Sequence, residues 1–358
     1  MRITSLRVEG LRILQHLHIE PCAAVNFVVG SNGAGKTSLL EAIYLAGRGR
    51  TFRHADSGPM IRDGCEGTTV LIEMFDEVKQ RRSILGLRRE RKTLVCRLDG
   101  QDLKKRSDLA EALPVQWIGS QPQLLLSLGP EVRRRFIDMG LFHVEQSYLP
   151  ILSEFLRILR QRNAAIRQNA GRESVQSWNL SLSRSSESVN KFREEFIDSL
   201  MKGTQSLLSN WETGFEMTYR YRPGWSGSET LLEQLERKFE VDLRQGYTGR
   251  GPQRAELELI ADGGLAERKL SRGQQKLLVL AMNLALVDLL VKTNKKLPVV
   301  LVDDLAAELD RENRERVMLE LGQRGIQGFL TKIEPNALVA PRGVATRTFH
   351  VEHGAIVA

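Results

Sequence analysis

Apolar and polar residues alternate in short runs along the N-terminal part of the chain. The runs lie at residues 3–8, 17–19, 69–72, 83–85 and 93–95. A period of two places the apolar side chains on one face of an extended segment, so each run predicts a strand with one buried face. This part of the chain is therefore expected to be rich in strands.

The apolar spacing changes to a helical period after Gly129 and Pro130. One stripe of apolar residues runs from Tyr148 to Leu159 and a second from Val189 to Leu200, and each predicts a helix with a packed face. Residues 168–188 are rich in Ser, Arg and Glu, which predicts a loop or helix junction. Further along, the pattern predicts a strand at 215–221, a helix at 230–244 and a strand at 257–259.

These patterns predict an α/β protein with an insertion. Residues 1–128 and 246–358 are expected to form one mixed α/β lobe, and residues 129–245 a mostly helical arm inserted into it. The chain shows no internal repeat. A length of 358 residues with 41% hydrophobic content allows such a pair of domains, each with its own core.

A phosphate-binding motif lies between a predicted strand and a predicted helix. Residues 30–37 fit G-x-x-x-x-G-K-[ST], the P-loop, after the apolar run 24–29 and before the helical run 38–45. Its glycines let successive N–H groups turn inward around an anion, and the helix N-terminus adds partial positive charge. The expected nucleotide-binding residues are Gly30, Ser31, Asn32, Gly33, Ala34, Gly35, Lys36 and Thr37. Lys36 is expected to reach the β- and γ-phosphates, and the Thr37 hydroxyl to hold Mg²⁺.

A second acidic motif completes the expected site. Four apolar residues, 299–302, precede Asp303 and Asp304, as in a Walker B strand. A buried parallel strand delivers such residues to its carboxyl end, where ligands bind in open α/β sheets. We expect Asp303 to help hold Mg²⁺ and Asp304 to act as base or to orient the attacking water.

Residues 270–278 support two compatible interpretations. Ser271 and Gln274 form a capping box that predicts the start of a helix over residues 273–291. The same Ser-x-Gly-Gln pattern is the signature of ATP-binding-cassette ATPases, and a helix N-terminus with Ser and Gly suits a γ-phosphate. The order of P-loop, signature and Walker B is typical of that class.

The charge distribution favours a polyanionic partner. The net charge is +8, and seven basic residues lie within residues 79–92. Clusters of this kind neutralise DNA phosphates and release counterions, although a charge excess also serves a merely solvated surface. The DNA-binding candidates are Arg81, Arg82, Arg88, Arg89, Arg91 and Lys92.

The cysteines, the N-terminal residues and the apolar runs indicate the cellular compartment. Cys22, Cys65 and Cys96 are far apart and fit no metal-binding spacing, so we expect reduced thiols. The N-terminal residues lack a hydrophobic signal region, and no apolar run approaches a membrane span. We expect a cytoplasmic protein with no membrane association.

Taken together, these motifs give the chain a family resemblance. It resembles the RecF family of bacterial recombination and replication-repair ATPases, which is related to the SMC class, and the likeness runs nearly end to end. Besides the three motifs, the resemblance rests on residues 50–53, 129–138, 248–252 and 308–310. It implies an ABC/SMC-type P-loop ATPase lobe with a mixed β-sheet and a mostly helical inserted arm.

The resemblance also implies a mechanism. ATP with Mg²⁺ closes a homodimer on DNA, and slow, DNA-stimulated hydrolysis opens it, so that the protein works as a switch. Ser271 and Gly273 of one copy contact the ATP held by the other, and Gln121 senses the metal and the attacking water. One nucleotide contact is expected from Arg12, Arg50 or Arg53, among which the sequence does not choose.

The implied partners are double-stranded DNA, gapped or single-stranded DNA, and the proteins RecR and RecO. The implied roles are replication, recombinational gap repair and the SOS response. The chain departs from the family pattern at Gln253, where His is usual, at Ala307, where Ser is usual, and at residues 120–121. These departures bear on the hydrolysis rate and on communication across the dimer.

Other classes of protein share part of this pattern. A membrane-transporter ATPase subunit has no need of the basic segment, and an SMC-type structural ATPase carries long heptad repeats that do not fit between Lys36 and Ser271. Two alternatives stay open: a related ATPase with another DNA-linked role such as defence, and a scaffold that binds ATP without hydrolysing it. The consecutive carboxylates Asp303 and Asp304 argue mildly against the scaffold.

Overall fold

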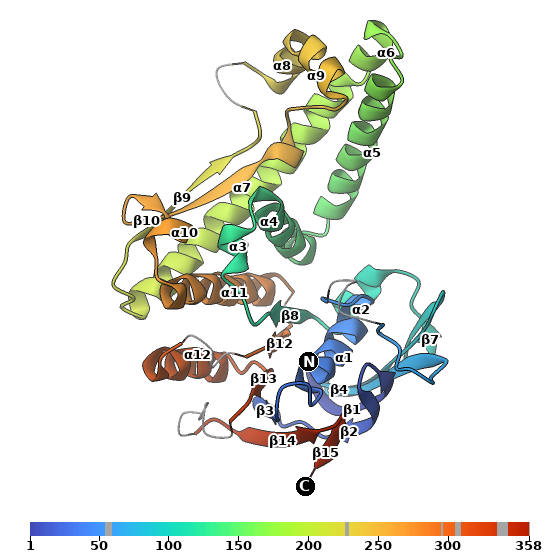
Figure 1. The fold of residues 1–358 in the computed structure, drawn as a ribbon, viewed down its shortest axis with the longest axis vertical. Helices are drawn as coiled ribbons and strands as arrows, with labels where there is room; N and C mark the ends of the chain where they lie inside the picture. The colour runs from blue at the N-terminus through green and yellow to red at the C-terminus, as the bar shows by residue number, and fades with distance from the viewer. Residues whose placement is uncertain (54–58, 226–228, 295, 305–308, 335–342, 358) are drawn as a thin grey trace. The chain divides into compact units, whose positions relative to one another are not determined.

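The computed structural model describes residues 1–53, 59–225, 229–294, 296–304, 309–334 and 343–357. The chain forms two compact units, Met1–Pro122 with Leu290–Ala358, and Gln123–Leu289. Each unit has its own helices and strands (Figure 1).

An antiparallel sheet forms one layer of the first unit. Its strand order is β2-β1-β4-β5-β6-β7. The strands are β1 (Arg2–Leu11), β2 (Leu14–Ile19), β4 (Gly67–Asp76), β5 (Arg81–Glu90), β6 (Leu94–Leu98) and β7 (Gln101–Asp102). Buried positions alternate with more exposed ones along β4, which confirms the expected one-sided strands.

A second, mostly parallel sheet carries the motifs of the first unit. Its order is β15-β14-β3-β13-β12-β8, and only β15 runs antiparallel to its neighbour. The strands are β3 (Val25–Val29), β8 (Val115–Ile118), β12 (Val299–Val302), β13 (Gly328–Lys332), β14 (Thr346–Glu352) and β15 (Ala355–Val357). Strands β3 and β12 are buried along their whole length, as expected of central parallel strands.

Helix α1 (Lys36–Arg48) packs its apolar side chains against both sheets of the first unit. Leu39 and Ile43 of this helix share one buried cluster with Leu6 of β1 and Phe329 of β13. The helix ends at Gly49, which takes a left-handed conformation with φ 61°. Helices α2 (Arg106–Ala112) and α12 (Arg311–Gln323) belong to the same unit.

The second unit is mostly helical. Its described helices are α3 (Leu124–Ser127), α4 (Pro130–Val144), α5 (Tyr148–Arg167), α6 (Arg172–Gln176), α7 (Asn179–Asn210), α8 (Leu231–Arg237), α9 (Phe239–Gln245), α10 (Ala266–Lys269), the greater part of α11 (Arg272–Asn294), and the 3₁₀ turn η2 (Pro252–Arg254). Helices α5 and α7 run side by side (Figure 1). Within the described part of the chain, no helix is both long and apolar enough to cross a membrane.

A small antiparallel sheet completes the second unit. Its order is β11-β10-β9, with β9 (Met217–Arg222), β10 (Glu256–Ala261) and β11 (Gly264–Leu265). Tyr221 pairs with Leu257, and Met217 pairs with Ala261. The strands expected near 215–221 and 257–259 are therefore confirmed, and they are partners.

Two ion pairs of buried arginines involve the segments 129–138 and 248–252 of this unit. Arg193 of α7 donates to both carboxylate oxygens of Asp138 at 2.9 Å and to the Pro252 carbonyl at 2.7 Å. Arg162 of α5 donates to Asp242 at 2.9 Å and to Thr248 at 2.7 Å, and the Arg162 side chain is fully buried. Residues 129–138 and 248–252 therefore hold the packing of the second unit together.

Helix α7 begins earlier than the sequence predicts. It starts at Asn179, inside segment 168–188, which is expected to be a loop or helix junction and which contains the junction between α6 and α7. Ser183, Ser185 and Ser186 are buried there, and the Ser185 hydroxyl donates to the Leu182 carbonyl within the helix. These side chains occupy little space, and the Ser185 hydroxyl is satisfied by the backbone, so a segment that looks polar in sequence forms a packed helix.

The boundaries of the units also differ from the expected domains. Residues 246–289 pack with the helical unit, because β10 pairs with β9 and Arg193 holds Pro252. The segment expected to be one helix at 230–244 contains two, α8 and α9, which meet at Lys238.

Candidate nucleotide-binding site

The P-loop connects β3 to α1 and presents an open helix N-terminus. Gly33 and Gly35 have φ angles of 80° and 116°, which L side chains rarely adopt. Gly35 is the N-cap of α1, no side chain caps it, and the first turn carries no acidic residue. A Cβ on Gly33 would meet no atom within 4 Å. Space is therefore open at Gly33, and the uncapped N-terminus of α1 fits an anion such as a phosphate.

Lys36 is folded over its own loop. Its Nζ donates to the carbonyls of Gly30 at 2.8 Å and Ser31 at 2.9 Å. Burial lowers the pKa of Lys36, while the nearby carboxylates of Asp303 and Asp304 oppose this change. The lysine thus lies at the loop in reach of both the carbonyls and the acidic pair, as a phosphate-binding lysine requires.

Thr37 and Asp303 lie together, as the expected metal site demands. The Thr37 hydroxyl is 3.2 Å from each carboxylate oxygen of Asp303. Asp303 follows β12, and its N–H donates to the Ile118 carbonyl of β8 at 3.0 Å. Two segments far apart in the sequence therefore bring side-chain oxygens to one point.

Thr331 on β13 is a site residue that the sequence did not reveal. Its hydroxyl donates to Asp303 Oδ1 at 2.7 Å and accepts the N–H of Asp304 at 2.7 Å. Asp304 itself has a left-handed φ of 52°, which Asp tolerates better than most residues. One hydroxyl therefore orients the first carboxylate and fixes the backbone of the second.

Gln121 lies on the loop that follows β8, and its side chain is exposed. Strand β8 is the parallel neighbour of β12, and Ile118 pairs with Val302. Gln121 and Asp303 therefore both come after the carboxyl ends of adjacent strands. Ala307 and Glu308 lie outside the described residues.

A buried carboxylate on α1 holds two of the three candidate nucleotide arginines. Glu41 is fully buried, and its oxygens accept from Arg12 at 2.9 and 3.1 Å and from Thr51 at 2.5 Å. Arg53 Nε lies 3.2 Å from the same carboxylate. Glu41 lies in α1, about one turn after the P-loop. Its contacts therefore connect Arg12, Thr51 and Arg53 to the helix that begins at the candidate nucleotide site. Arg50 is exposed.

The signature motif forms the predicted capping box in the second unit. The Ser271 N–H donates to the Gln274 side chain at 3.0 Å, and the Ser271 hydroxyl accepts the Gln274 N–H at 3.3 Å. Helix α11 begins at Arg272, one residue before the predicted start. Ser271 is exposed, whereas Gly273 is half-buried in the first turn.

The basic candidates on β5 point to two different faces of the antiparallel sheet. Arg82 and Arg88 pair with Phe75 and Thr69, whereas Arg81 and Arg89 share the face of the buried Leu85. Carboxylates partly neutralise this segment. Arg81 pairs with Asp99 at 2.8 Å, and Arg88 pairs with Glu90 at 3.0 Å. Lys92 lies in the turn after β5. The six candidates therefore do not form one continuous basic face.

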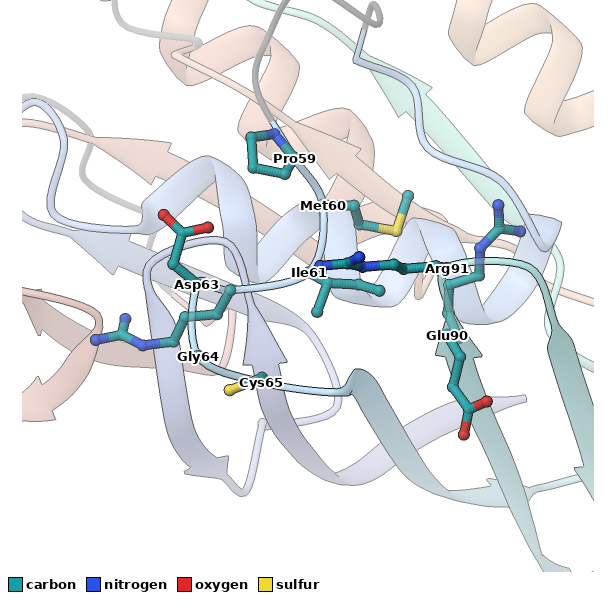
Figure 2. Close-up of a pocket in the computed structure, with 10 residues that line it drawn as sticks. Pro59, Met60, Ile61, Asp63, Gly64, Cys65, Glu90 and Arg91 are labelled. Carbon is teal, nitrogen blue, oxygen red and sulfur yellow. The ribbon is translucent and has the colours of Figure 1, made fainter.

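Arg89 and Arg91 line a separate cavity of about 280 Å³ (Figure 2). Met60, Ile61 and Cys65 form much of its other wall. This wall joins the antiparallel sheet, because Ile61 bridges to Leu11 of β1.

The residues at the P-loop fit a magnesium nucleotide. Among the described residues, no group of three or more His, Cys, Asp or Glu side chains is arranged as a metal cage. Mg²⁺ in nucleotide sites keeps waters and phosphate oxygens and needs only one or two protein oxygens, which Thr37 and Asp303 supply. The uncapped α1 N-terminus and Lys36 supply the positive field for phosphates.

Comparison with known proteins agrees with this geometry. The model of the RecF/RecN/SMC N terminal domain family matches residues 2–355. The DNA replication and repair protein RecF of Shewanella baltica (strain OS155 / ATCC BAA-1091) is 35% identical over 358 residues, covering 99% of each chain. The protein of the same name from Thioalkalivibrio sulfidiphilus (strain HL-EbGR7) is 35% identical over 356 residues, with the same coverage.

Solved structures show the same fold. The recombination mediator protein RecF-ATP in the RecFOR pathway superposes with a TM-score of 0.86 at 20% identity, covering 99% of this chain and 96% of the other. The Smc head domain of Pyrococcus furiosus, bound to the C-terminal domain of ScpA, superposes with a TM-score of 0.57 at 15% identity, covering 99% and 94%. The predicted ABC/SMC-type ATPase fold is therefore confirmed.

Proposed function

The chain belongs to the RecF family, and from that premise we propose that it is an ATP-dependent DNA-binding protein of replication and recombinational repair. The observation that carries the proposal is the meeting of Thr37 and Asp303, at 3.2 Å, beside an uncapped P-loop helix. A glycine-rich turn alone would not bring these two side chains together.

Each residue of the site has a task that its position supports. The loop N–H groups and Lys36 bind the phosphates, and Thr37 with Asp303 holds the metal. Asp304 orients or deprotonates the attacking water, and Gln121 reports the state of the metal and that water. The bound Mg²⁺ neutralises charge on the transferred phosphoryl group. Glu41 of the P-loop helix orients Arg12 and Arg53, two of the candidate nucleotide-binding arginines.

ATP closes a homodimer in this proposal. Ser271 and Gly273 of one copy meet the nucleotide held by the other, which is why the Ser271 hydroxyl lies exposed at the N-terminus of a long helix. Binding energy gained across two such sites stabilises the dimer as long as ATP is present. Slow hydrolysis then opens it, so the protein acts as a switch.

Double-stranded and gapped or single-stranded DNA are the proposed nucleic-acid partners, and RecR and RecO the proposed protein partners, in the cytoplasm. The phosphate contacts come from Arg82, Arg91 and Lys92. None of the three forms an ion pair with a carboxylate among the described residues. Arg81 and Arg88 contribute less because each already has a carboxylate partner.

The test is ATP hydrolysis by the whole chain with and without a gapped duplex, beside an Asp304→Asn variant. We expect DNA to raise the rate, and Asp304→Asn to bind ATP while hydrolysis falls by about 100-fold or more. Tight ATP binding with no hydrolysis under any condition contradicts the switch and leaves a nucleotide-binding scaffold.

A further inference from the structure

Arg133 of α4 connects the end of α3 with the first residue of β10. Its Nη1 donates to the carbonyls of Leu125 at 3.1 Å and of Leu126 at 2.6 Å. Its Nε and Nη2 donate to the two carboxylate oxygens of Glu256 at 2.8 and 3.0 Å. The side chains of Arg133 and Glu256 are only 13% and 20% exposed. A two-point contact of this kind fixes direction as well as distance, so one guanidinium holds two elements that are far apart in the sequence.

Helix α3 is held by this arginine at its C-terminal end. The helix is a single short turn, and the Leu124 carbonyl accepts the Leu128 N–H at 3.0 Å. The next two carbonyls accept from Arg133. Carbonyls at a helix C-terminus lack partners within the helix, and a cationic side chain is one of the groups that satisfy them. The place of α3 is therefore set by contacts to its backbone, besides the burial of Leu125 and Leu126.

Strand β10 leads from this contact to the signature motif. It pairs with β11, and α10 follows β11 directly and contacts both β10 and α3. The Gln275 side chain of α11 donates to the Glu267 and Leu270 carbonyls, each at 2.9 Å, and so ties α10 to the first turn of α11. Ser271 lies between these two helices in the chain. The segment of Ser271 is therefore joined to both elements that Arg133 holds.

Helix α3 is also the first helix after Gln121. It begins at Leu124, directly after the loop that carries Gln121. The neighbour of Arg133 adds a contact on the β10 side, because Arg134 Nη1 donates to the Ala255 carbonyl at 2.7 Å. Two consecutive arginines of α4 therefore hold the start of β10, and one of them also holds the helix that follows Gln121.

Resting on the proposed function, we infer that Arg133 is a positioning residue for ATP-driven dimerisation. It acts through Glu256 and α3, and it sets the place of Ser271 relative to the helix that follows Gln121. A contact across the dimer needs the Ser271 segment held in one place beforehand, because ordering it on association would weaken the dimer. Loosening the Arg133–Glu256 pair should therefore weaken dimerisation, while each copy still binds ATP through its own P-loop.

Glu256→Gln and Arg133→Lys test the inference in the whole chain. The first keeps the size of the side chain and removes its charge, and the second keeps the charge but loses the two-point contact. Calorimetric titration at concentrations where the protein is monomeric gives the affinity for ATP–Mg²⁺. Light scattering gives the protein concentration at which ATP–Mg²⁺ forms dimers. We expect that concentration to rise about tenfold in both variants, with ATP affinity changed by less than about twofold.

Asp242→Asn is the matched control. It removes the charge of a buried carboxylate in the same unit, in a pair with Arg162 that joins α9 to α5. We expect it to lower the free energy of unfolding, measured with denaturant, without shifting the dimerisation concentration. Glu256→Asp keeps the carboxylate and should dimerise more readily than Glu256→Gln. If Arg133 only stabilised the fold, Asp242→Asn and Glu256→Gln would shift dimerisation together.

Two results overturn the inference. One is unchanged dimerisation in Glu256→Gln and Arg133→Lys, and the other is an equal shift in Asp242→Asn. Where Glu256→Gln does not fold, Arg133→Lys decides alone. Failure of the proposed function looks different, because the unsubstituted chain then forms no dimer with ATP–Mg²⁺ at any concentration. The two failures are therefore distinguishable.

Discussion

The Thr331 hydroxyl donates to Asp303 Oδ1 at 2.7 Å and ties the end of β13 to the end of β12. The Thr331 hydroxyl oxygen also accepts the N–H of Asp304. The two acidic residues of the site therefore share one support, which contacts the Asp303 carboxylate and the Asp304 backbone. Outer contacts of this kind orient metal-binding carboxylates.

Replacing Thr331 by valine tests that support. Thr331→Val keeps the shape but leaves the Asp304 N–H without its acceptor and Asp303 without one donor. We expect hydrolysis to fall by about 10- to 100-fold, with ATP affinity changed much less. Single-turnover hydrolysis beside calorimetric binding measures both. Thr348→Val, at an exposed position of β14, is the control, and equal rates in the two variants contradict the role.

Ser271→Ala separates helix capping from contact across the dimer. Loss of the cap costs about 1 kcal/mol of stability. Thr230 caps α8 with the same box, its hydroxyl accepting the Glu233 N–H at 3.3 Å, so Thr230→Ala is a matched control. We expect both variants to bind ATP as monomers and only Ser271→Ala to lose ATP-driven dimerisation. Chromatographic mass with ATP gives the answer, and normal dimers of Ser271→Ala refute the contact.

Removing Asp242 should destabilise the second unit strongly. Asp242→Ala leaves the fully buried Arg162 guanidinium without its counter-charge, which costs about 3–5 kcal/mol. Denaturant unfolding measures the loss. Glu131→Ala breaks the exposed pair with Arg135 and should change stability by less than about 0.5 kcal/mol. Similar losses of unfolding free energy in the two variants would show that burial of the ion pair does not determine how much it contributes to stability.

Arg91→Ala should weaken DNA binding without regard to sequence. A phosphate contact contributes about one unit to the slope of log affinity against log salt, so the variant should lower that slope by about 1. Arg135→Ala, on the second unit, serves as the comparison. Fluorescence anisotropy titrations of DNA at several salt concentrations measure the slopes. An unchanged slope for Arg91→Ala would show that Arg91 makes no phosphate contact.

The sequence predicts this site well where the signal is local. The P-loop, the strand before Asp303 and the Ser271 capping box each lie in one continuous segment, and the structure has all three. Thr331 was missed because its contact with Asp303 spans two strands. Glu41 was missed because a single acidic residue in a helix gives no sign that it will be buried against Arg12.

Long-range packing also explains the errors in the fold. The start of α7 depends on buried serines, and the placement of residues 246–289 depends on strand pairing with β9. Neither is visible in a local pattern. The basic candidates on β5 alternate between two faces of the sheet, which a count of charges along the sequence does not reveal, and their role in DNA binding stays a prediction.

The most direct test of the central claim is molar mass by light scattering, using Asp304→Asn to slow turnover. The protein is measured with and without ATP–Mg²⁺, and with and without a gapped duplex. The account predicts a monomer that becomes a dimer with ATP–Mg²⁺ and stays on the gapped duplex. A monomer under all conditions, with ATP bound and DNA ignored, contradicts it.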